Sequence, residues 1–307
     1  MIEMSRVSKS FDGHKVLDDL SFSVAHGELV GLLGANGAGK TTLMDILCGC
    51  LGADEGQVMV GGVDIVDNPL KVGGVIGYLP DESILYDDMR VNKYLEFCGS
   101  IRGIAGPALI RRVEEVVDLM SLEDVSRKLI RTLSKGFRQR VGIAQAMIHD
   151  PEILVLDEPT EGLDPSQISR LREFVKSLRN RKTVLLSSHI LAEVQDICDR
   201  SIILDHGNLV DSRGIDAENS EKEMYRLKVT SLGNLDQSIG QVPGCRLSEV
   251  SRENHEVVFS LESEEKLPAV MRLVCEGGHR LREISVSHRS LEDIYLSATT
   301  KNRGLNE

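Results

Sequence analysis

Short apolar runs alternate with longer amphipathic stretches over residues 28–205. Three runs are typical of buried strands: Glu28–Leu33, Ile153–Leu156 and Thr183–Leu186. They are mostly leucine and β-branched residues without polar alternation, as in parallel strands covered on both faces. Their alternation with helical periodicity predicts an α/β domain with a parallel sheet. Residues 1–30 differ, because alternating positions and turn glycines there predict short strands and turns.

The strand pattern is interrupted by a helical insertion over residues 88–148. Apolar residues recur there at helical spacing in two stretches, 91–101 and 109–120, which glycines and a proline separate. A further helix is expected to begin at Asp164 and Pro165, since aspartate caps a helix and proline suits its first position.

The pattern changes again after residue 211. Residues 212–223 are charged and rich in turn formers, so we expect a linker between a first domain, 1–211, and a second, 224–307. The second region combines strand alternation with helical stretches, which predicts a small α+β domain. Its expected strands are Tyr225–Val229, Glu256–Leu261 and Leu281–Ser287, and its expected helices are Leu267–Glu276 and Leu291–Ala298.

The clearest chemical signal follows the first buried strand. Residues 34–41 satisfy the pattern G-x-x-x-x-G-K-[ST] between a strand and a helix. Glycines let backbone N–H groups close around a phosphate, and the helix N-terminus adds partial positive charge. Lys40 is expected to bridge the β- and γ-phosphates, and the Thr41 hydroxyl to ligate Mg²⁺. The expected nucleotide-binding residues are Gly34, Asn36, Gly37, Ala38, Gly39, Lys40, Thr41 and Thr42.

Two acidic residues, Asp157 and Glu158, directly follow the second buried strand. They lie at its carboxyl end, where open α/β sheets bind ligands. Asp157 is expected to hold Mg²⁺, largely through water, and Glu158 to orient and polarise the attacking water as general base. Such a pair alone also fits a plain strand terminus. The upstream phosphate-binding loop favours the catalytic interpretation.

His189 ends the third apolar strand after two serines. At this edge of the sheet its ring could contact a γ-phosphate. A lone histidine is more often structural, so the position alone makes His189 only a candidate.

Composition and charge exclude several classes of protein. Hydrophobic residues make up 41% of the 307 residues and charged residues 27%, which fits a globular protein with a real core. No apolar run is long enough to span a bilayer, and the N-terminus lacks a signal-peptide pattern, so we expect a cytosolic location. The net charge is −12, with an acidic excess on both sides of residue 215, which disfavours nucleic-acid binding. The six cysteines match no zinc spacing.

A further motif makes the set recognisable. Residues 133–140 read Leu-Ser-Lys-Gly-Phe-Arg-Gln-Arg and resemble the signature motif of ATP-binding cassette (ABC) proteins. Residues 156–160, residues 162–165 and His189 then follow in that family's order. The resemblance covers roughly residues 1–215. It implies a P-loop ABC nucleotide-binding domain, with an antiparallel β subdomain and a helical insertion in an α/β fold.

The resemblance also implies roles that spacing alone does not. In this family two nucleotide-binding domains pack head to tail with two ATP molecules between them. Ser134 and the N–H groups near Gly136 are then expected at the γ-phosphate, where a helix begins. Adenine is expected to stack on Phe11. The alternative interpretation is that Phe11 is a core residue. Each site would combine this signature of one copy with residues of the other: Lys40, Thr41, Asp157, Glu158 and His189.

Three positions depart from the commonest family pattern. Lys135 replaces the first signature glycine, Phe137 stands where glutamine is commonest, and Asp81 occupies the usual glutamine position after residues 77–80. Asp81 is still expected in the site, contacting Mg²⁺ or the water differently. These departures, with residues 290–296, resemble the ATPase subunits of ABC-2-type exporters.

The resulting prediction is an ATP- and Mg²⁺-dependent ATPase subunit of an ABC transporter. It is expected to drive a separate membrane permease from the cytoplasmic face of the membrane, as an exporter, and to form a dimer with a second copy. The alternative is a soluble ABC-type ATPase that acts on ribosomes or DNA. Such relatives usually carry two cassettes or a long coiled-coil insertion, and neither is present in this sequence. An inactive binding module is disfavoured because Glu158, the expected base, is present.

Overall fold

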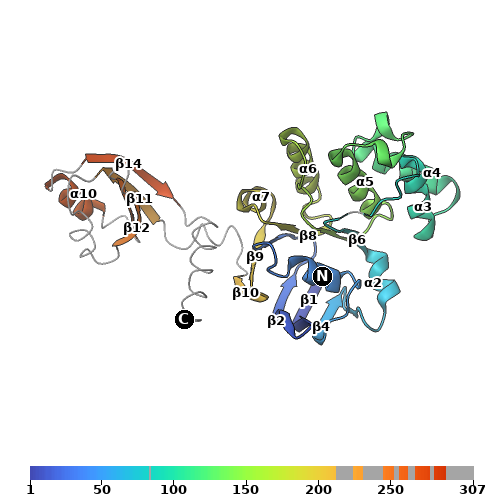
Figure 1. Cartoon of the computed structure of the whole chain (residues 1–307), viewed down its shortest axis with the longest axis horizontal. Coiled ribbons are helices and arrows are strands. Elements are labelled where there is room, and N and C mark those ends of the chain that lie inside the picture. The colour runs from blue at the N-terminus through green and yellow to red at the C-terminus, as the bar shows by residue number, and fades with distance from the viewer. Residues whose placement is uncertain are drawn as a thin grey trace. The chain divides into compact units, whose positions relative to one another are not determined.

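The chain divides into two compact units, Met1–Arg213 and Gly214–Glu307 (Figure 1). The predicted linker and the predicted helix at Leu291–Ala298 lie outside the residues that the structure describes. Those residues, in a computed structural model of the whole chain, are 1–82, 84–211, 224–230, 245–251, 256–261, 267–276 and 280–287.

A six-stranded sheet forms the centre of the first unit, in the order β10-β9-β3-β8-β7-β6. The neighbours from β9 to β6 are parallel, and β10 is antiparallel to β9. Every residue of β3, β7 and β8 is buried, which confirms the three strands predicted from continuous apolar runs. The strands are β3 (Leu29–Leu33), β6 (Ile76–Leu79), β7 (Ile153–Leu156), β8 (Thr183–Ser188), β9 (Arg200–Asp205) and β10 (Asn208–Asp211).

A four-stranded antiparallel sheet, in the order β2-β1-β4-β5, confirms the antiparallel β subdomain. The prediction of short strands over residues 1–30 is wrong, because β1 and β2 have 10 and 11 residues. Register shifts at three places along this pair break the apolar alternation, so the sequence shows one long hairpin as fragments. The strands are β1 (Ile2–Phe11), β2 (His14–Val24), β4 (Glu55–Val60) and β5 (Val63–Asp64).

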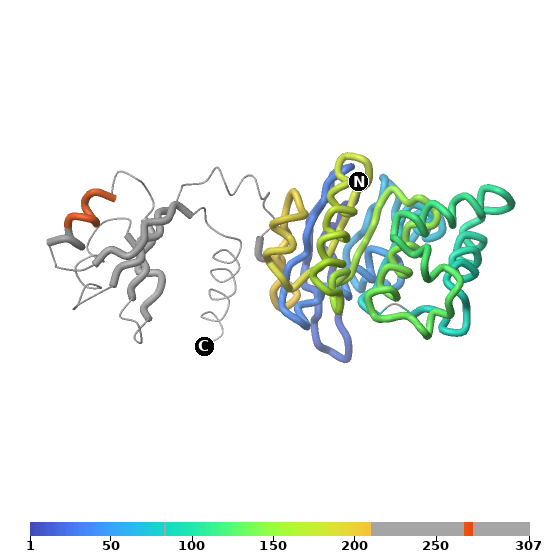
Figure 2. The backbone as a smooth tube through the Cα atoms, turned by 90° about the horizontal axis from the view of Figure 1, so that it is seen from above, coloured from blue at the N-terminus to red at the C-terminus, as the bar shows by residue number. Residues whose placement is uncertain are grey.

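The helical insertion is confirmed. Figures 1 and 2 both show α3 and α4 at one end of the first unit, beside α5. The predicted start of α6 is also confirmed, because Asp164 and Gln167 form a complete capping box there. The helices of this unit are α1 (Lys40–Leu47), α2 (Pro69–Val75), α3 (Val91–Ile101), α4 (Gly106–Leu119), α5 (Lys135–Met147), α6 (Pro165–Ser177) and α7 (Leu191–Ile197).

The main core joins the two sheets of the first unit through α1. Leu43, Met44 and Leu47 of this helix are buried in one hydrophobic cluster with side chains from β1, β2 and β3. Because α1 begins at Lys40, this burial fixes the phosphate-binding loop in place. In the described part of the chain, no helix is long and apolar enough to cross a membrane.

The second unit contains a four-stranded antiparallel sheet in the order β12-β13-β11-β14, with one described helix, as an α+β domain requires. The sequence missed β12, whose register shifts against β13 between Leu247 and Glu249 and so loses regular alternation. The elements are β11 (Met224–Thr230), β12 (Cys245–Ser251), β13 (Glu256–Leu261), α10 (Leu267–Glu276) and β14 (Arg280–Ser287).

Candidate active site

The carboxyl ends of β3, β6, β7 and β8 meet at one edge of the parallel sheet. A cleft of about 710 Å³ opens there, and segments that follow all four strands line it. The structure therefore brings together side chains far apart in sequence, from Val16 to His189, as expected for ligand sites in open α/β sheets. The lining residues are Val16, Asn36, Gly37, Gly39, Lys40, Thr41, Thr42, Asp81, Glu158, Glu161 and His189.

The phosphate-binding loop has the backbone that its glycines predict. Gly37 and Gly39 have φ values of +81° and +106°, in the region where other residues are strained. At Gly39 a Cβ would also lie only 2.7 Å from Cδ2 of Leu17. Of the remaining predicted loop residues, Ala38 is buried, and a Cβ at Gly34 would lie 2.5 Å from the carbonyl oxygen of Leu204. Gly34 and Ala38 thus shape the loop without lining the cleft.

Lys40 lies almost entirely inside the loop, with 6% of the residue exposed. Its Nζ donates a hydrogen bond of 2.8 Å to the carbonyl oxygen of Gly34 and a longer one of 3.4 Å to that of Ala35. The same Nζ lies 3.3 Å from Oε1 of Glu158, which forms a buried ion pair. The ammonium is thus held at the edge of the cleft, where an anionic phosphate could replace the carboxylate.

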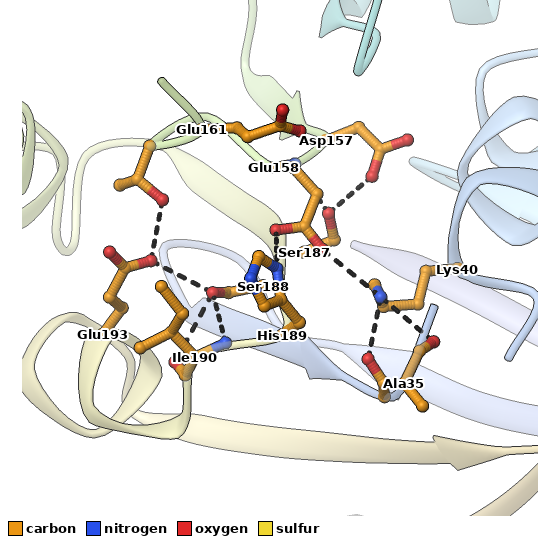
Figure 3. A network of polar contacts seen from close by, with 12 residues as sticks. Ala35, Lys40, Asp157, Glu158, Glu161, Ser187, Ser188, His189, Ile190 and Glu193 are labelled. Carbon is orange, nitrogen blue, oxygen red and sulfur yellow. Dashed lines mark hydrogen bonds and ion pairs between the residues drawn. The ribbon is translucent and has the colours of Figure 1, made fainter. Parts of the chain in front are cut away.

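Glu158 lies between Lys40 and His189, as Figure 3 shows. Oε2 of Glu158 is 2.9 Å from Nδ1 of His189, and Oε1 faces Lys40. The residue is buried, and its φ of +44° lies in the left-handed region that non-glycine residues rarely adopt. Strained backbone of this kind persists only where surrounding contacts enforce it.

Ser187, at the end of β8, provides one of those contacts. Its hydroxyl donates a 2.5 Å hydrogen bond to Oδ1 of Asp157 and accepts a 2.8 Å bond from the backbone N–H of Glu158. One hydroxyl therefore positions both neighbouring acids. Ser187 was not among the predicted site residues. Its only signal was a polar side chain at a strand end, next to the strand that carries the acids.

Asp157 is completely buried, and its Oδ2 has no hydrogen-bond partner among the described residues. Burial raises the pKa of Asp157, opposed by the hydroxyls of Ser187 and Thr41. A buried carboxylate oxygen without a hydrogen-bond partner lowers the stability of the folded protein. The side-chain oxygens of Asp157 and Thr41 fit Mg²⁺, which prefers oxygen ligands. Mg²⁺ usually takes only a few ligands from the protein and the others from water or phosphate. In residues 1–82 and 84–211, no group of three His, Cys, Asp or Glu could hold a metal.

Asp81 connects this cleft to a second cavity of about 480 Å³ beside it, since Asp81 and Glu161 line both. Burial raises the pKa of Asp81, and the negative charges of Asp157 and Glu161 add to this effect. Glu161 in turn pairs with Lys135, whose Nζ lies 2.9 Å from its Oε1. The two unusual residues, Asp81 and Lys135, are therefore linked through one carboxylate.

The signature residues Ser134 and Gly136 are not among the residues that line the 710 Å³ cleft. The Ser134 hydroxyl caps α5 and accepts a 3.4 Å hydrogen bond from the N–H of Phe137. Gly136 packs so closely on α6 that a Cβ would lie 2.2 Å from Oε1 of Gln167. The helix start predicted at the signature is confirmed, and Ser134 and Gly136 do not line the cleft of their own copy.

Phe11 lies at the end of β1 and is 44% exposed, so the alternative of a core phenylalanine is wrong. The ammonium of Lys9 lies 5.5 Å from its ring centroid, a cation–π distance. The ring is therefore available for stacking.

Comparison with known proteins decides the family. The profile of the family described as "ABC transporter" matches residues 17–161. The uncharacterized ABC transporter ATP-binding protein YhcH of Bacillus subtilis (strain 168) is 34% identical over 97% of this chain and 96% of its own length. The chain belongs to the ABC transporter family. Members of this family of ATP-binding proteins hydrolyse ATP, so this ABC protein is an ATPase.

Solved structures agree with this assignment. An ATP-binding subunit of an ABC transporter is 29% identical with a TM-score of 0.66, covering 72% of this chain and 92% of that one. The dimeric ATP-binding cassette MJ0796, in a post-hydrolysis state bound to ADP and Pi, has a TM-score of 0.66 at 23% identity. It covers 70% of this chain and 99% of its own and shows the fold alone. The predicted family, fold class and ATPase activity of this ABC protein are thereby confirmed.

Proposed function

We propose that this ABC ATPase is a transporter subunit that hydrolyses ATP with Glu158 as the general base. It drives a separate membrane permease in the export direction. The observation that carries the chemical part is the Lys40–Glu158–His189 cluster at the phosphate-binding loop. The export direction is supported by Lys135 and Asp81, which resemble the ABC-2-type branch.

The cluster suggests how hydrolysis proceeds. When ATP enters, its phosphates attract Lys40, which leaves Glu158 free to accept a proton from the attacking water. His189, held by its Nδ1 against Glu158, contacts the γ-phosphate. Thr41 and Asp157 would hold Mg²⁺, with Asp81 near it. The metal would neutralise charge on the phosphates.

The signature is proposed to complete the site of a second copy. Ser134 and Gly136 do not line the cleft of their own copy, although the exposed start of α5 suits an anionic phosphate. A head-to-tail dimer brings each signature to the other copy's ATP. Hydrolysis would then weaken the dimer by removing the bridging γ-phosphate, a change that can be passed to a partner.

An exposed apolar patch offers a place for the permease. Ile84 and Tyr86 lie in the segment between β6 and α3, and Phe97 and Ile101 lie four residues apart on α3. Ile84 and Ile101 are 85% and 68% exposed. The rings of Tyr86 and Phe97 pack with centroids 5.6 Å apart. Clustered exposed apolar side chains are typical of protein interaction sites. This patch follows Asp81 in the chain, so it can sense the state of the nucleotide.

The test is purification of the tagged full-length protein from native membranes in mild detergent. We expect a stoichiometric polytopic membrane protein to co-purify, which would support a cytoplasmic-face location. The double variant Ile84→Ser/Ile101→Ser is expected to lose this partner and keep its ATP affinity. Val66→Ser/Leu70→Ser, two equally exposed apolar residues elsewhere, is the matched control. Co-purification of ribosomal proteins or DNA instead would favour the alternative function.

A further inference from the structure

Glu193 on α7 is a buried carboxylate with 2% exposure that does not line the nucleotide cleft. Its Oε2 accepts a 3.0 Å hydrogen bond from the hydroxyl of Ser188 (Figure 3). The same oxygen accepts a 2.8 Å hydrogen bond from the hydroxyl of Thr160. Its nearest described cation, Arg172, lies at 3.7 Å from Oε1. Burying a carboxylate is unfavourable, and apolar residues often stabilise such positions as well. The arrangement therefore calls for a role beyond stability.

The two hydroxyls that bind Glu193 belong to the two catalytic segments. Thr160 lies two residues after Glu158, and Ser188 lies immediately before His189. The Ser188 hydroxyl also accepts a 3.0 Å hydrogen bond from the N–H of Ile190, so both neighbours of His189 are held. One oxygen atom thus connects the segments whose separation sets the 2.9 Å contact between His189 and Glu158.

We propose that Glu193 is a positioning residue for ATP hydrolysis, which acts by fixing the His189 segment against the Glu158–Thr160 segment. The inference rests on the roles proposed above for Glu158 and His189. Glu193 itself touches neither the nucleotide nor the water. Small misplacements of a reacting group reduce rates strongly, so loosening these segments should lower kcat more than ATP affinity.

The substitution Glu193→Gln tests this with little change in volume. The neutral amide keeps one oxygen at this place, but an uncharged oxygen is a weaker acceptor than a carboxylate oxygen, so the hydrogen bonds from Thr160 and Ser188 should both weaken. We expect kcat for ATP to fall about tenfold, with the KM and the ATP dissociation constant changed less than about twofold. Ser188→Ala cuts the same connection and should give the same pattern, which provides a second variant if Glu193→Gln does not fold. Glu173→Gln, an exposed acid on α6, is the matched control and should keep full kcat.

The decisive measurement adds His189→Ala and the double variant His189→Ala/Glu193→Gln in the full-length protein. If Glu193 acts through His189, Glu193→Gln should change kcat less than about twofold in the His189→Ala background. Equal loss in both backgrounds would show a general structural role and overturn the inference. Full kcat in Glu193→Gln and Ser188→Ala, with loss in His189→Ala, would overturn it alone. Full kcat in His189→Ala would overturn the proposed role of His189 and this inference with it.

Discussion

Single side chains in this site hold in place the neighbours to which we assign chemistry. Glu158 has a left-handed backbone, and its carboxylate is shared between Lys40 and His189. The hydroxyl of Ser187 fixes this geometry through hydrogen bonds with the backbone N–H of Glu158 and the carboxylate of Asp157. Residues that do not touch ATP therefore influence the position of those that do.

Replacement of Ser187 by alanine tests this dependence. The change leaves the Glu158 N–H and the Asp157 Oδ1 without their shared partner, and unsatisfied buried groups cost about 1–3 kcal/mol each. For the two groups together we expect urea unfolding to show a stability loss of about 2–6 kcal/mol, and we expect kcat to fall by about tenfold or more. Ser201→Ala, at a buried serine of β9, is the control for loss of a hydroxyl. Unchanged kcat in Ser187→Ala would remove Ser187 from the catalytic arrangement.

At the level of elements, patterns of apolar residues predicted most of the fold. The three continuous apolar strands, the insertion and the Asp164 cap are all where the sequence predicts them. The long hairpin and β12 were not predicted because register shifts interrupt their alternation, and alternation is the main signal that a single sequence gives for a half-buried strand.

The candidate site was predictable only where its residues follow a local sequence pattern. The phosphate-binding loop and the acids follow strands in chain order, so local sequence predicts their shared edge. Ser187 and Glu193 act through contacts between segments about 30 residues apart. No local pattern encodes such contacts, and their polar side chains resemble any strand end or helix surface.

His149 provides a prediction about how two elements are held together. It follows α5, and its Nε2–H donates a 3.0 Å hydrogen bond to the carbonyl oxygen of Ile76 at the start of β6. Burial lowers the pKa of His149 from 6.5 to about 4, with nearby Arg102 adding to the effect. The folded state thus favours the neutral ring, whereas the unfolded chain takes up a proton below pH 6.5.

Stability from His149 should be complete above pH 6.5 and should fall as the pH drops towards 4, since the unfolded state binds more protons in that window. The expected loss at pH 5 is about 2 kcal/mol. His149→Gln keeps a donor for Ile76 but does not titrate. Urea unfolding of both proteins at pH 7.5 and pH 5, followed by circular dichroism, should show a smaller pH-dependent loss in the variant. The same loss in both proteins would exclude His149 as its cause.

The whole molecule is an acidic protein with an ATPase unit and a second, α+β unit. The first unit contains half of each composite site that we propose. The Lys135–Glu161–Asp81 connection links the signature of one copy to that copy's own cleft. Binding of ATP in one cleft could therefore affect the signature that serves the other.

The composite site predicts a specific defect for Ser134→Arg. A large cation at the exposed start of α5 should block the approach of the second copy's ATP without altering the phosphate-binding loop. We expect hydrolysis to fall at least about 100-fold, with ATP affinity of the single copy unchanged. Ser169→Arg, at an exposed serine of α6, is the matched control for added charge. Normal turnover in the Ser134→Arg protein would mean that the signature is not at the γ-phosphate.

The role of Glu158 as general base is tested most directly by ATP turnover of the full-length protein and its Glu158→Gln variant, with ATP affinity measured on both. Gln keeps the shape of the side chain but cannot accept the proton from the attacking water. We expect a loss of turnover of about 100-fold or more, with ATP binding retained. Turnover that survives this substitution unchanged would contradict the assignment of Glu158 as the general base.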